Sequence, residues 1–278
     1  MIETIEFLGQ PARRLRASDG AQATMLLHGA QVVSWIPAGG VEQLYLSPDA
    51  VVEDGRAVRG GIPVIFPQFE QRGPLPRHGL ARTRSWQWIE GIQRGAVVMG
   101  VMQMTDDEKS RALWPQEFEA ELCVSVCGNQ LDLELAVVNR GISQFEFTTA
   151  LHTYLQCGDL LKTRLAGLYG ARYLDSLTGL EQRQEMDPIS FVGEVDRIYF
   201  DAAEPVIVTS PNGRLNIESA GFDDLVVWNP GPDKGASIAD LPAQGWRHLL
   251  CVEAACIGRP VRLAPGSEWS ARQSLQAA

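Results

Sequence analysis

The sequence lacks any apolar run long enough to cross a membrane. Its longest apolar stretches, such as residues 96–102, fall far short of the roughly 18 residues that a spanning helix needs. It also lacks the signature of a signal peptide, because residues 1–16 have no apolar central region and their arginines follow the apolar residues. We therefore expect no membrane partner and a cytoplasmic location.

Positive charge is also scarce. The 278 residues include 24 Lys and Arg against 34 Asp and Glu, which gives a net charge of −10 and an isoelectric point near 4.9. Nucleic acids and anionic membranes are bound by basic surfaces, which so acidic a chain does not offer in general. We therefore expect no nucleic-acid partner.

Cysteines are few and follow no recognised pattern. Their number is odd, and the spacing of Cys123 and Cys127 does not match a CxxC motif. We interpret all five as reduced thiols, most of them buried: Cys123, Cys127, Cys157, Cys251 and Cys256. A nucleophile elbow, a P-loop, a dinucleotide-binding loop and a HExxH zinc motif are missing, so nothing supports nucleotide hydrolysis, dinucleotide redox chemistry or zinc hydrolysis.

Helical periodicity is nearly absent, and strand periodicity takes its place. Only residues 106–114 predict a short helix, which Pro115 would end. Apolar and other residues alternate over 122–126 and 131–137, and the Gly-Asn turn between these runs predicts a hairpin. Further strand-like runs cover residues 23–36, 96–104, 145–155, 205–209, 225–229, 248–254 and 269–275.

These patterns predict an all-β protein. Strands do not alternate with helices, which argues against a doubly wound parallel sheet. The chain contains 27 glycines and 16 prolines, which supply turns throughout, but it has no linker and no internal repeat. We therefore predict a single domain over residues 1–278, built as a large antiparallel β-sandwich of two sheets with few short helices.

Arginine is concentrated in one segment of this acidic chain. Residues 56–84 contain six arginines, no lysine and one acid, Glu70. The segment is also rich in glycine and proline, which predicts loops of the kind that often carry binding sites. The planar guanidinium group suits phosphate and carboxylate, so the cluster indicates an anion site, although any one arginine could instead be solvated or paired with an acid. The six are Arg56, Arg59, Arg72, Arg77, Arg82 and Arg84.

Two kinds of side chain could carry acid–base chemistry. Glu253 lies in an apolar run, with no other charge over residues 249–257, so it occupies either the polar face of a strand or a pocket. In a pocket, desolvation would raise its pKa and make it a better base near neutral pH. His152 lies in a strand-like segment that is poor in charge, and His78 lies within the arginine-rich loop. From local sequence alone, a lone strand histidine such as His152 is more often structural than functional.

Seven segments, in order along nearly the whole chain, resemble the aldose 1-epimerase (mutarotase) superfamily, and within it the hexose-6-phosphate mutarotases. One of them, His78-Gly79-Leu80-Ala81-Arg82, is similar to the family's His-Gly-Phe-Ala-Arg motif, with Leu80 in place of phenylalanine. The matching segments are residues 28–35, 59–67, 78–82, 150–154, 193–199, 227–230 and 251–253. The resemblance implies a galactose mutarotase-like β-supersandwich with its site on the concave face of one sheet.

The resemblance also implies roles for individual residues. His152 matches the general acid, and Glu253 matches the general base. Three further positions match substrate-binding residues, and His78 matches the histidine of the motif; these three are Arg59, Arg82 and Asp196. Arg77, which stands where the family more often has glutamine or alanine, is a further candidate for binding a phosphate. No metal ion and no organic cofactor is implied.

These roles predict an isomerase that interconverts the α and β anomers of a hexose 6-phosphate, with glucose 6-phosphate as the first candidate. We expect a monomer whose partner is this small sugar phosphate. Three alternatives stay open: a mutarotase for unphosphorylated aldoses, a non-catalytic carbohydrate-binding β-sandwich, and a metal-dependent β-barrel enzyme with His78, His152 and Glu253 as ligands.

Overall fold

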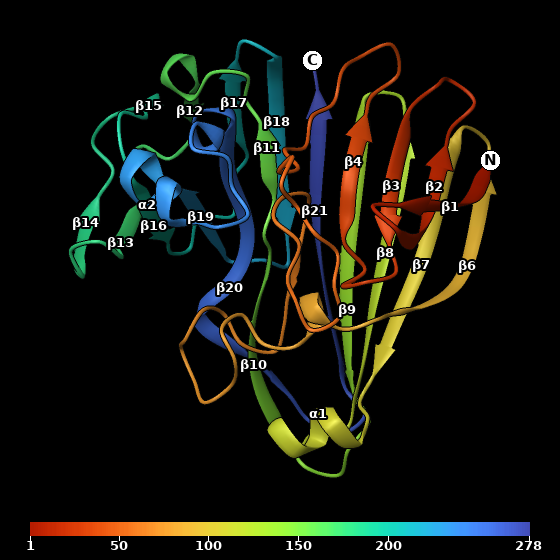
Figure 1. The fold of residues 1–278 in the computed structure, drawn as a ribbon. Coiled ribbons are helices and arrows are strands. Elements are labelled where there is room, and N and C mark those ends of the chain that lie inside the picture. The colour runs from red at the N-terminus through yellow and green to blue at the C-terminus, as the bar shows by residue number, and fades with distance from the viewer.

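Two large antiparallel sheets and one small sheet make up the structure, a computed structural model that describes residues 1–278 (Figure 1). The largest sheet has nine strands, and most of its centre consists of long hairpin-connected strands. In sheet order these strands are β15 (Ile189–Ser190), β12 (Arg164–Ala166), β17 (Val206–Ser210), β18 (Gly213–Ala220), β21 (Glu268–Ala277), β9 (Gln130–Asn139), β8 (Phe118–Cys127), β7 (Val97–Thr105) and β6 (Gln87–Arg94).

The second large sheet has eight strands, and it carries the candidate site. Along its main path lie β14 (Leu180–Arg183), β13 (Arg172–Asp175), β16 (Val195–Tyr199), β19 (Asp224–Asn229), β20 (Leu249–Leu263), β10 (Phe145–Leu151) and β5 (Val64–Ile65). The eighth strand, β11 (Tyr154–Gln156), also pairs with β20, so the long β20 joins most of the sheet together.

The small sheet has four strands in chain order at the N-terminus. Its strands are β1 (Ile2–Phe7), β2 (Gln10–Arg16), β3 (Gln22–Leu26) and β4 (Val32–Ile36). Contacts of β2 and β3 with β7 and β8 pack this sheet onto one end of the nine-stranded sheet. The predicted fold class, an all-β protein with large antiparallel sheets and few helices, is confirmed.

The hydrophobic core lies between the sheets, and it follows from the alternation in the sequence. Along β8, buried and half-buried positions alternate over the whole strand, as expected when one face packs on the core. A continuous cluster of 54 buried residues includes side chains from all three sheets, among them Trp35, Leu122 and Val252. The core therefore holds the eight-stranded sheet rigidly against the rest of the molecule.

Two short α-helices complete the fold. The first, α1 (Glu108–Leu113), lies within the predicted segment, and Asp107 caps it by accepting from the backbone N–H of Ser110 at 2.6 Å. The second, α2 (Gly231–Ser237), was not predicted, because Pro230 and Pro232 flank its first residue; proline is nevertheless compatible with the first helical positions. Three 3₁₀ turns are also present: η1 (Ala81–Thr83), η2 (Leu160–Lys162) and η3 (Gly245–His248).

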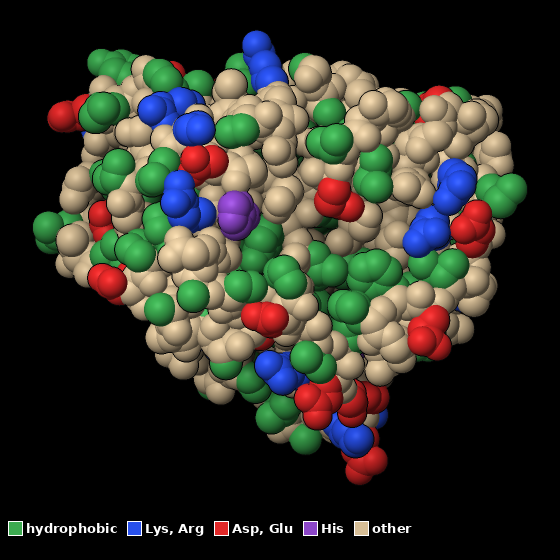
Figure 2. Space-filling model, turned by 45° about the horizontal axis from the view of Figure 1, so that its top comes forward, with side chains coloured by type: hydrophobic (Ala, Val, Ile, Leu, Met, Phe, Trp, Pro, Cys, Tyr) green, Lys and Arg blue, Asp and Glu red, His purple; other side chains and the backbone are tan.

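The structure corrects two of the predicted strands. Residues 23–36 form two strands, β3 and β4, with a turn between them, and residues 145–155 are interrupted at His152 and Thr153 between β10 and β11. No helix is long and apolar enough to cross a bilayer. On the face shown in Figure 2, basic and acidic side chains are interspersed and form no continuous basic surface.

Candidate active site

A pocket of about 200 Å³ lies on the eight-stranded sheet, and it brings together every site residue that the sequence predicted. Its lining includes Arg59, Arg77, His78, Arg82, His152, Asp196 and Glu253. These residues come from five separate segments of the chain, so their convergence is a property of the fold. The pocket also includes residues that the sequence did not single out: Phe69, Glu70, Tyr154, Val226, Trp228, Lys234 and Ile238.

The floor of the pocket is the face of the eight-stranded sheet that turns away from the main core. Along β20, Leu250, Val252 and Ala254 pack into the core, so Cys251 and Glu253 point to the opposite face. Strand pairing then aligns side chains across the sheet. Tyr154 on β11 pairs with Cys251, which pairs with Trp228 on β19, which pairs with Asp196 on β16.

The catalytic candidates His152 and Glu253 touch each other at this floor. The imidazole Nδ1 of His152 lies 3.2 Å from Oε1 of Glu253, and both side chains are buried. Neither Nδ1 nor the other carboxylate oxygen, Oε2, has a hydrogen-bond partner of good geometry. Buried polar atoms without partners are costly, so these two atoms are suited to bind a ligand that enters the pocket.

Burial also sets the protonation of this pair. Burial raises the pKa of Glu253 well above its usual value, and the nearby carboxylate of Asp196 raises it further. Burial lowers the pKa of His152 well below its usual value, and the positive charges of Arg82 and Arg59 lower it further. In the free pocket the surroundings therefore favour a protonated carboxyl and a neutral imidazole.

Tyr154 connects the histidine to one of the arginines. Its ring stacks on the imidazole of His152, with ring centres 4.7 Å apart and planes 9° from parallel. The Tyr154 hydroxyl accepts from Nη1 of Arg59 at 3.2 Å, and Nε of Arg59 donates to Asp240 at 3.1 Å. Two hydrogen bonds thus fix Arg59, and the ring of Tyr154 links it to His152.

The arginine-rich loop forms the wall of the pocket. At its centre, His78 and Gly79 both have left-handed backbones, with φ of 66° and 72°. A side chain at Gly79 would put its Cβ only 2.3 Å from the carbonyl oxygen of Phe66, so this close approach requires glycine. His78 is held by a hydrogen bond from the Glu70 backbone N–H to its Nδ1 at 3.3 Å, and its pKa is strongly lowered, first by burial and then by Arg82.

Arg82 lines the pocket without an acidic partner. Its Nη2 donates to the carbonyl oxygen of Arg77 at 3.1 Å, whereas its Nε is buried with no partner. By contrast, Arg77 is paired with Glu70 at 3.2 Å. Burial lowers the pKa of Arg82 to about 10, and the neighbouring arginines add to this effect. An uncompensated, partly buried guanidinium is a strong site for an anion.

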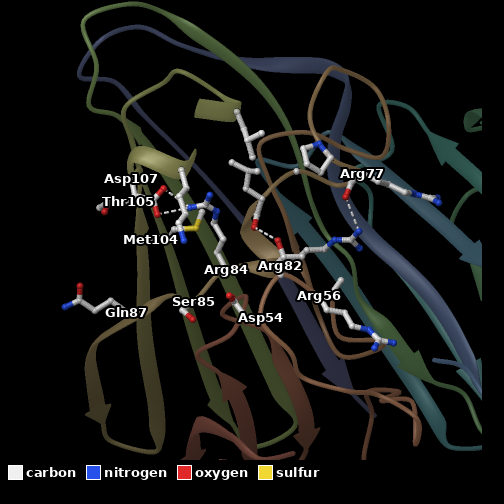
Figure 3. Close-up of a pocket in the computed structure, with 18 of the residues that line it drawn as sticks. Asp54, Arg56, Arg77, Arg82, Arg84, Ser85, Gln87, Met104, Thr105 and Asp107 are labelled. Carbon is white, nitrogen blue, oxygen red and sulfur yellow. Dashed lines mark hydrogen bonds and ion pairs between the residues drawn. The ribbon is translucent and has the colours of Figure 1, made fainter. Parts of the chain in front are cut away.

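A second hollow, of about 920 Å³, lies on the other side of Arg77 and Arg82 (Figure 3). In Figure 3, Arg82 extends toward the backbone of Arg77, while Arg84 points away to Asp107. Nη1 of Arg84 lies 2.8 Å from Oδ1 of Asp107, and Nη1 of Arg56 lies 3.8 Å from Oε2 of Glu53. These two arginines therefore already have acidic partners. Arg82 therefore divides the two hollows and is open to an anion in a way that Arg84 is not.

Asp196 lies on the side of the pocket formed by β16 and α2. It forms no ion pair, and its neighbour Arg197 instead packs over the ring of Tyr173 at 4.7 Å. Burial raises the pKa of Asp196, and the positive charge of Lys234 on α2 partly opposes this shift. Lys234 itself donates to Glu194 at 2.6 Å, so the carboxylate of Asp196 is available to a ligand.

Comparison with known proteins identifies the family of this chain. The family model described as aldose 1-epimerase matches residues 12–276. The chain belongs to the aldose 1-epimerase family. It is 34% identical to a protein of Cenchrus ciliaris over 95% of this chain and 83% of the relative, and 30% identical to one of Escherichia coli K12 over 92% and 87%. Both relatives are provisionally named glucose-6-phosphate 1-epimerases.

A solved structure supports the same assignment. A protein from Salmonella typhimurium, provisionally named a mutarotase, superposes with a TM-score of 0.86 at 26% identity, over 100% of this chain and 97% of that chain. As a member of the aldose 1-epimerase family, the chain is an enzyme, an isomerase of the mutarotase type.

Three of the seven residues of this mutarotase pocket that sequence reasoning missed are Tyr154, Trp228 and Lys234. A usable signal existed for Tyr154, because it follows His152 by two positions and shares its strand-like run. Lys234 could not be found in this way, since it lies on the helix α2 that the prolines concealed.

Proposed function

We propose that this mutarotase interconverts the α and β anomers of glucose 6-phosphate. The observation that carries the proposal is a pocket with a buried acid–base pair on its floor and an unpaired arginine, Arg82, in its wall. The names of the relatives from Cenchrus ciliaris and Escherichia coli support the same substrate.

The reaction needs only two proton transfers with the sugar. In the substrate complex the carboxyl proton of Glu253 first passes to His152, which leaves a carboxylate beside an imidazolium. Glu253 then takes the proton of the anomeric hydroxyl, while His152 gives a proton to the ring oxygen, so that the bond between C1 and the ring oxygen breaks. The aldehyde then rotates about C1–C2, and the reverse transfers close the ring to the other anomer. Both oxygens are bonded to C1, so two groups 3.2 Å apart on one side of the sugar can serve both. Each transfer is worth about 10²–10⁴-fold in rate.

The phosphate group of the substrate would also raise the pKa of His152, the proposed acid. Burial lowers the pKa of His152 in the free pocket, and the charges of Arg82 and Arg59 lower it further. A phosphate dianion beside these arginines offsets their charge, which favours the protonated imidazole that the reaction requires. The negative charge of the substrate therefore helps to raise the pKa of His152, so that His152 can act as a proton donor.

Anomer exchange measured by NMR with glucose 6-phosphate, galactose 6-phosphate and free glucose tests the proposal. We expect the first to be the best substrate, because contacts between arginine and phosphate are worth roughly 1.5–3 kcal/mol each. Arg82→Ala should raise the KM for glucose 6-phosphate roughly 10- to 100-fold while changing that for glucose much less. Arg84→Ala is the matched control, since Arg84 lines only the second hollow and is already paired with Asp107.

Equal effects of Arg82→Ala on both sugars would contradict a sugar phosphate as substrate and favour a mutarotase for free aldoses. Absence of exchange with all three sugars would contradict the proposed function as a whole.

A further inference from the structure

Beneath the catalytic candidates lies a buried thiol that the proposed reaction does not use. Cys251 precedes Glu253 by two positions on β20, so it points to the same face of the sheet. One ligand atom each from His152, Cys251 and Glu253 lies within 4.8 Å of the others. We propose that these three side chains form a binding site for a thiophilic divalent cation such as Zn²⁺, which inhibits the enzyme.

The arrangement suits such an ion in distance and in chemistry. Zn²⁺ binds cysteine sulfur at about 2.3 Å and histidine nitrogen or carboxylate oxygen at about 2.0–2.2 Å, in tetrahedral geometry. Ligand atoms within 4.8 Å of one another need only small side-chain rotations to meet around it. A set of one thiolate, one imidazole and one carboxylate favours Zn²⁺ and Cd²⁺ over Mg²⁺ and Ca²⁺, which prefer oxygen ligands.

Unused bonding capacity at the three side chains points to the same conclusion. His152 Nδ1 and Glu253 Oε2 are buried without a hydrogen-bond partner. The thiols of Cys157 and Cys256 donate to the carbonyl oxygens of Arg247 and Gly221, whereas the thiol of Cys251 donates to none. The three residues are 7%, 0% and 1% exposed for His152, Cys251 and Glu253. A cation would therefore satisfy three groups at once in a site shielded from water.

This ligand set differs from the one that the sequence offered. His78 is not a member, because its Nδ1 already accepts from the Glu70 backbone and its ring centre lies 5.6 Å from that of His152. Cys251 takes its place. Binding releases the protons of the Cys251 thiol and the Glu253 carboxyl to solvent and occupies both His152 and Glu253, so the ion competes with the sugar for the proton-transfer groups.

Cd²⁺ titration of the purified protein, followed by the ultraviolet charge-transfer band of a cadmium–thiolate bond, tests the proposal directly. Every variant in this titration also carries Cys123→Ser and Cys127→Ser, because these two cysteines are partly exposed and could bind Cd²⁺ themselves. We expect one ion per chain in this background, with affinity lowered about 10- to 100-fold and the band lost in Cys251→Ser. The matched control is Cys256→Ser on the same strand, which faces the main core and should leave the band unchanged.

The functional arm uses anomer exchange in the presence of Zn²⁺. Cys251→Ser should retain exchange but require roughly 10- to 100-fold more Zn²⁺ for half-inhibition. Equal Cd²⁺ affinity in the parent and in Cys251→Ser, or equal binding of Mg²⁺, would overturn the site. If Cys251→Ser fails to fold, by circular dichroism, His152→Asn provides the same comparison in the Cd²⁺ titration. The titration needs no turnover, so failure of the metal site and failure of the proposed function are separate outcomes.

Discussion

His152 reaches Glu253 because two residues, His152 and Thr153, depart from the strand pattern. β10 ends at Leu151 and β11 begins at Tyr154, so His152 lies in the interruption, where its backbone N–H donates to the carbonyl of Pro63 at 3.0 Å. The sequence leaves open whether Glu253 lies on the polar face of a strand or in a pocket, and it gives no sign of this interruption. The identity of the pair was accessible through the family resemblance, whereas its contact depends on a hydrogen bond between distant segments.

The pair gives the first prediction at this scale. Glu253→Gln and His152→Asn should each lower kcat for anomer exchange by about 10²-fold or more, since each removes a proton-transfer group and keeps a similar shape. Thermal unfolding of both variants serves as the control for folding. A kcat within a few-fold of the parent in either variant would remove that residue from the mechanism.

Asp196 gives the second prediction. Its carboxylate is free of ion pairs and lies across the pocket floor from Tyr154, so it can accept hydrogen bonds from sugar hydroxyls. Asp196→Asn should therefore weaken the binding of glucose 6-phosphate and of free glucose by similar factors, because the contact is to the sugar ring that both share. KM values for both sugars check this, with Arg82→Ala as the contrasting variant. A change confined to the phosphorylated sugar would place the carboxylate near the phosphate instead.

Among secondary-structure elements, long alternating strands are predictable and short interruptions are not. The hairpin of β8 and β9 has the predicted turn at Gly128 and Asn129, since alternation and turn chemistry agree there. Segments 23–36 and 145–155 were each read as one strand, because apolar residues continue through their turns. Helix α2 was missed for the opposite reason: its prolines resemble loop residues, although they suit a helix start.

The cap of α1 gives a prediction at this scale. The pKa of Asp107 is lowered from its usual value of 3.8 by the hydrogen bond from Ser110 and then by Arg84. A lowered carboxyl pKa means that its stabilising contribution is present above the usual value and is lost as pH falls below it. Asp107→Ala should cost about 1 kcal/mol of unfolding free energy at pH 7, and less at a pH well below 3.8, where the carboxyl is protonated.

Chemical unfolding at both pH values measures this difference. Asp107→Asn is the control, because asparagine caps a helix about as well but cannot pair with Arg84, so its cost at pH 7 should be smaller. An equal cost of Asp107→Ala at both pH values would show that the charge of Asp107 does not contribute.

At the scale of the whole molecule, the continuous core predicts cooperative unfolding. The cluster of 54 buried residues joins the small N-terminal sheet to both large sheets through side chains such as Trp35 and Val252. We expect a single calorimetric transition that coincides with the loss of tryptophan fluorescence and of strand signal in circular dichroism. A separate early transition would show that the N-terminal sheet is an independent unit and would contradict the single domain predicted from the sequence.

The anchoring of residues 59–67 has a consequence for altering substrate preference by protein engineering. Backbone hydrogen bonds tie this segment to three others: Gly61 donates to Tyr45, Ile62 donates to Val32, and the carbonyl of Pro63 holds His152. Exchanging it for a homologous loop would therefore displace His152 along with Arg59. Residues 71–77 are mostly exposed and form few such bonds, so libraries that aim at new sugars should vary this stretch and leave Arg59 in place.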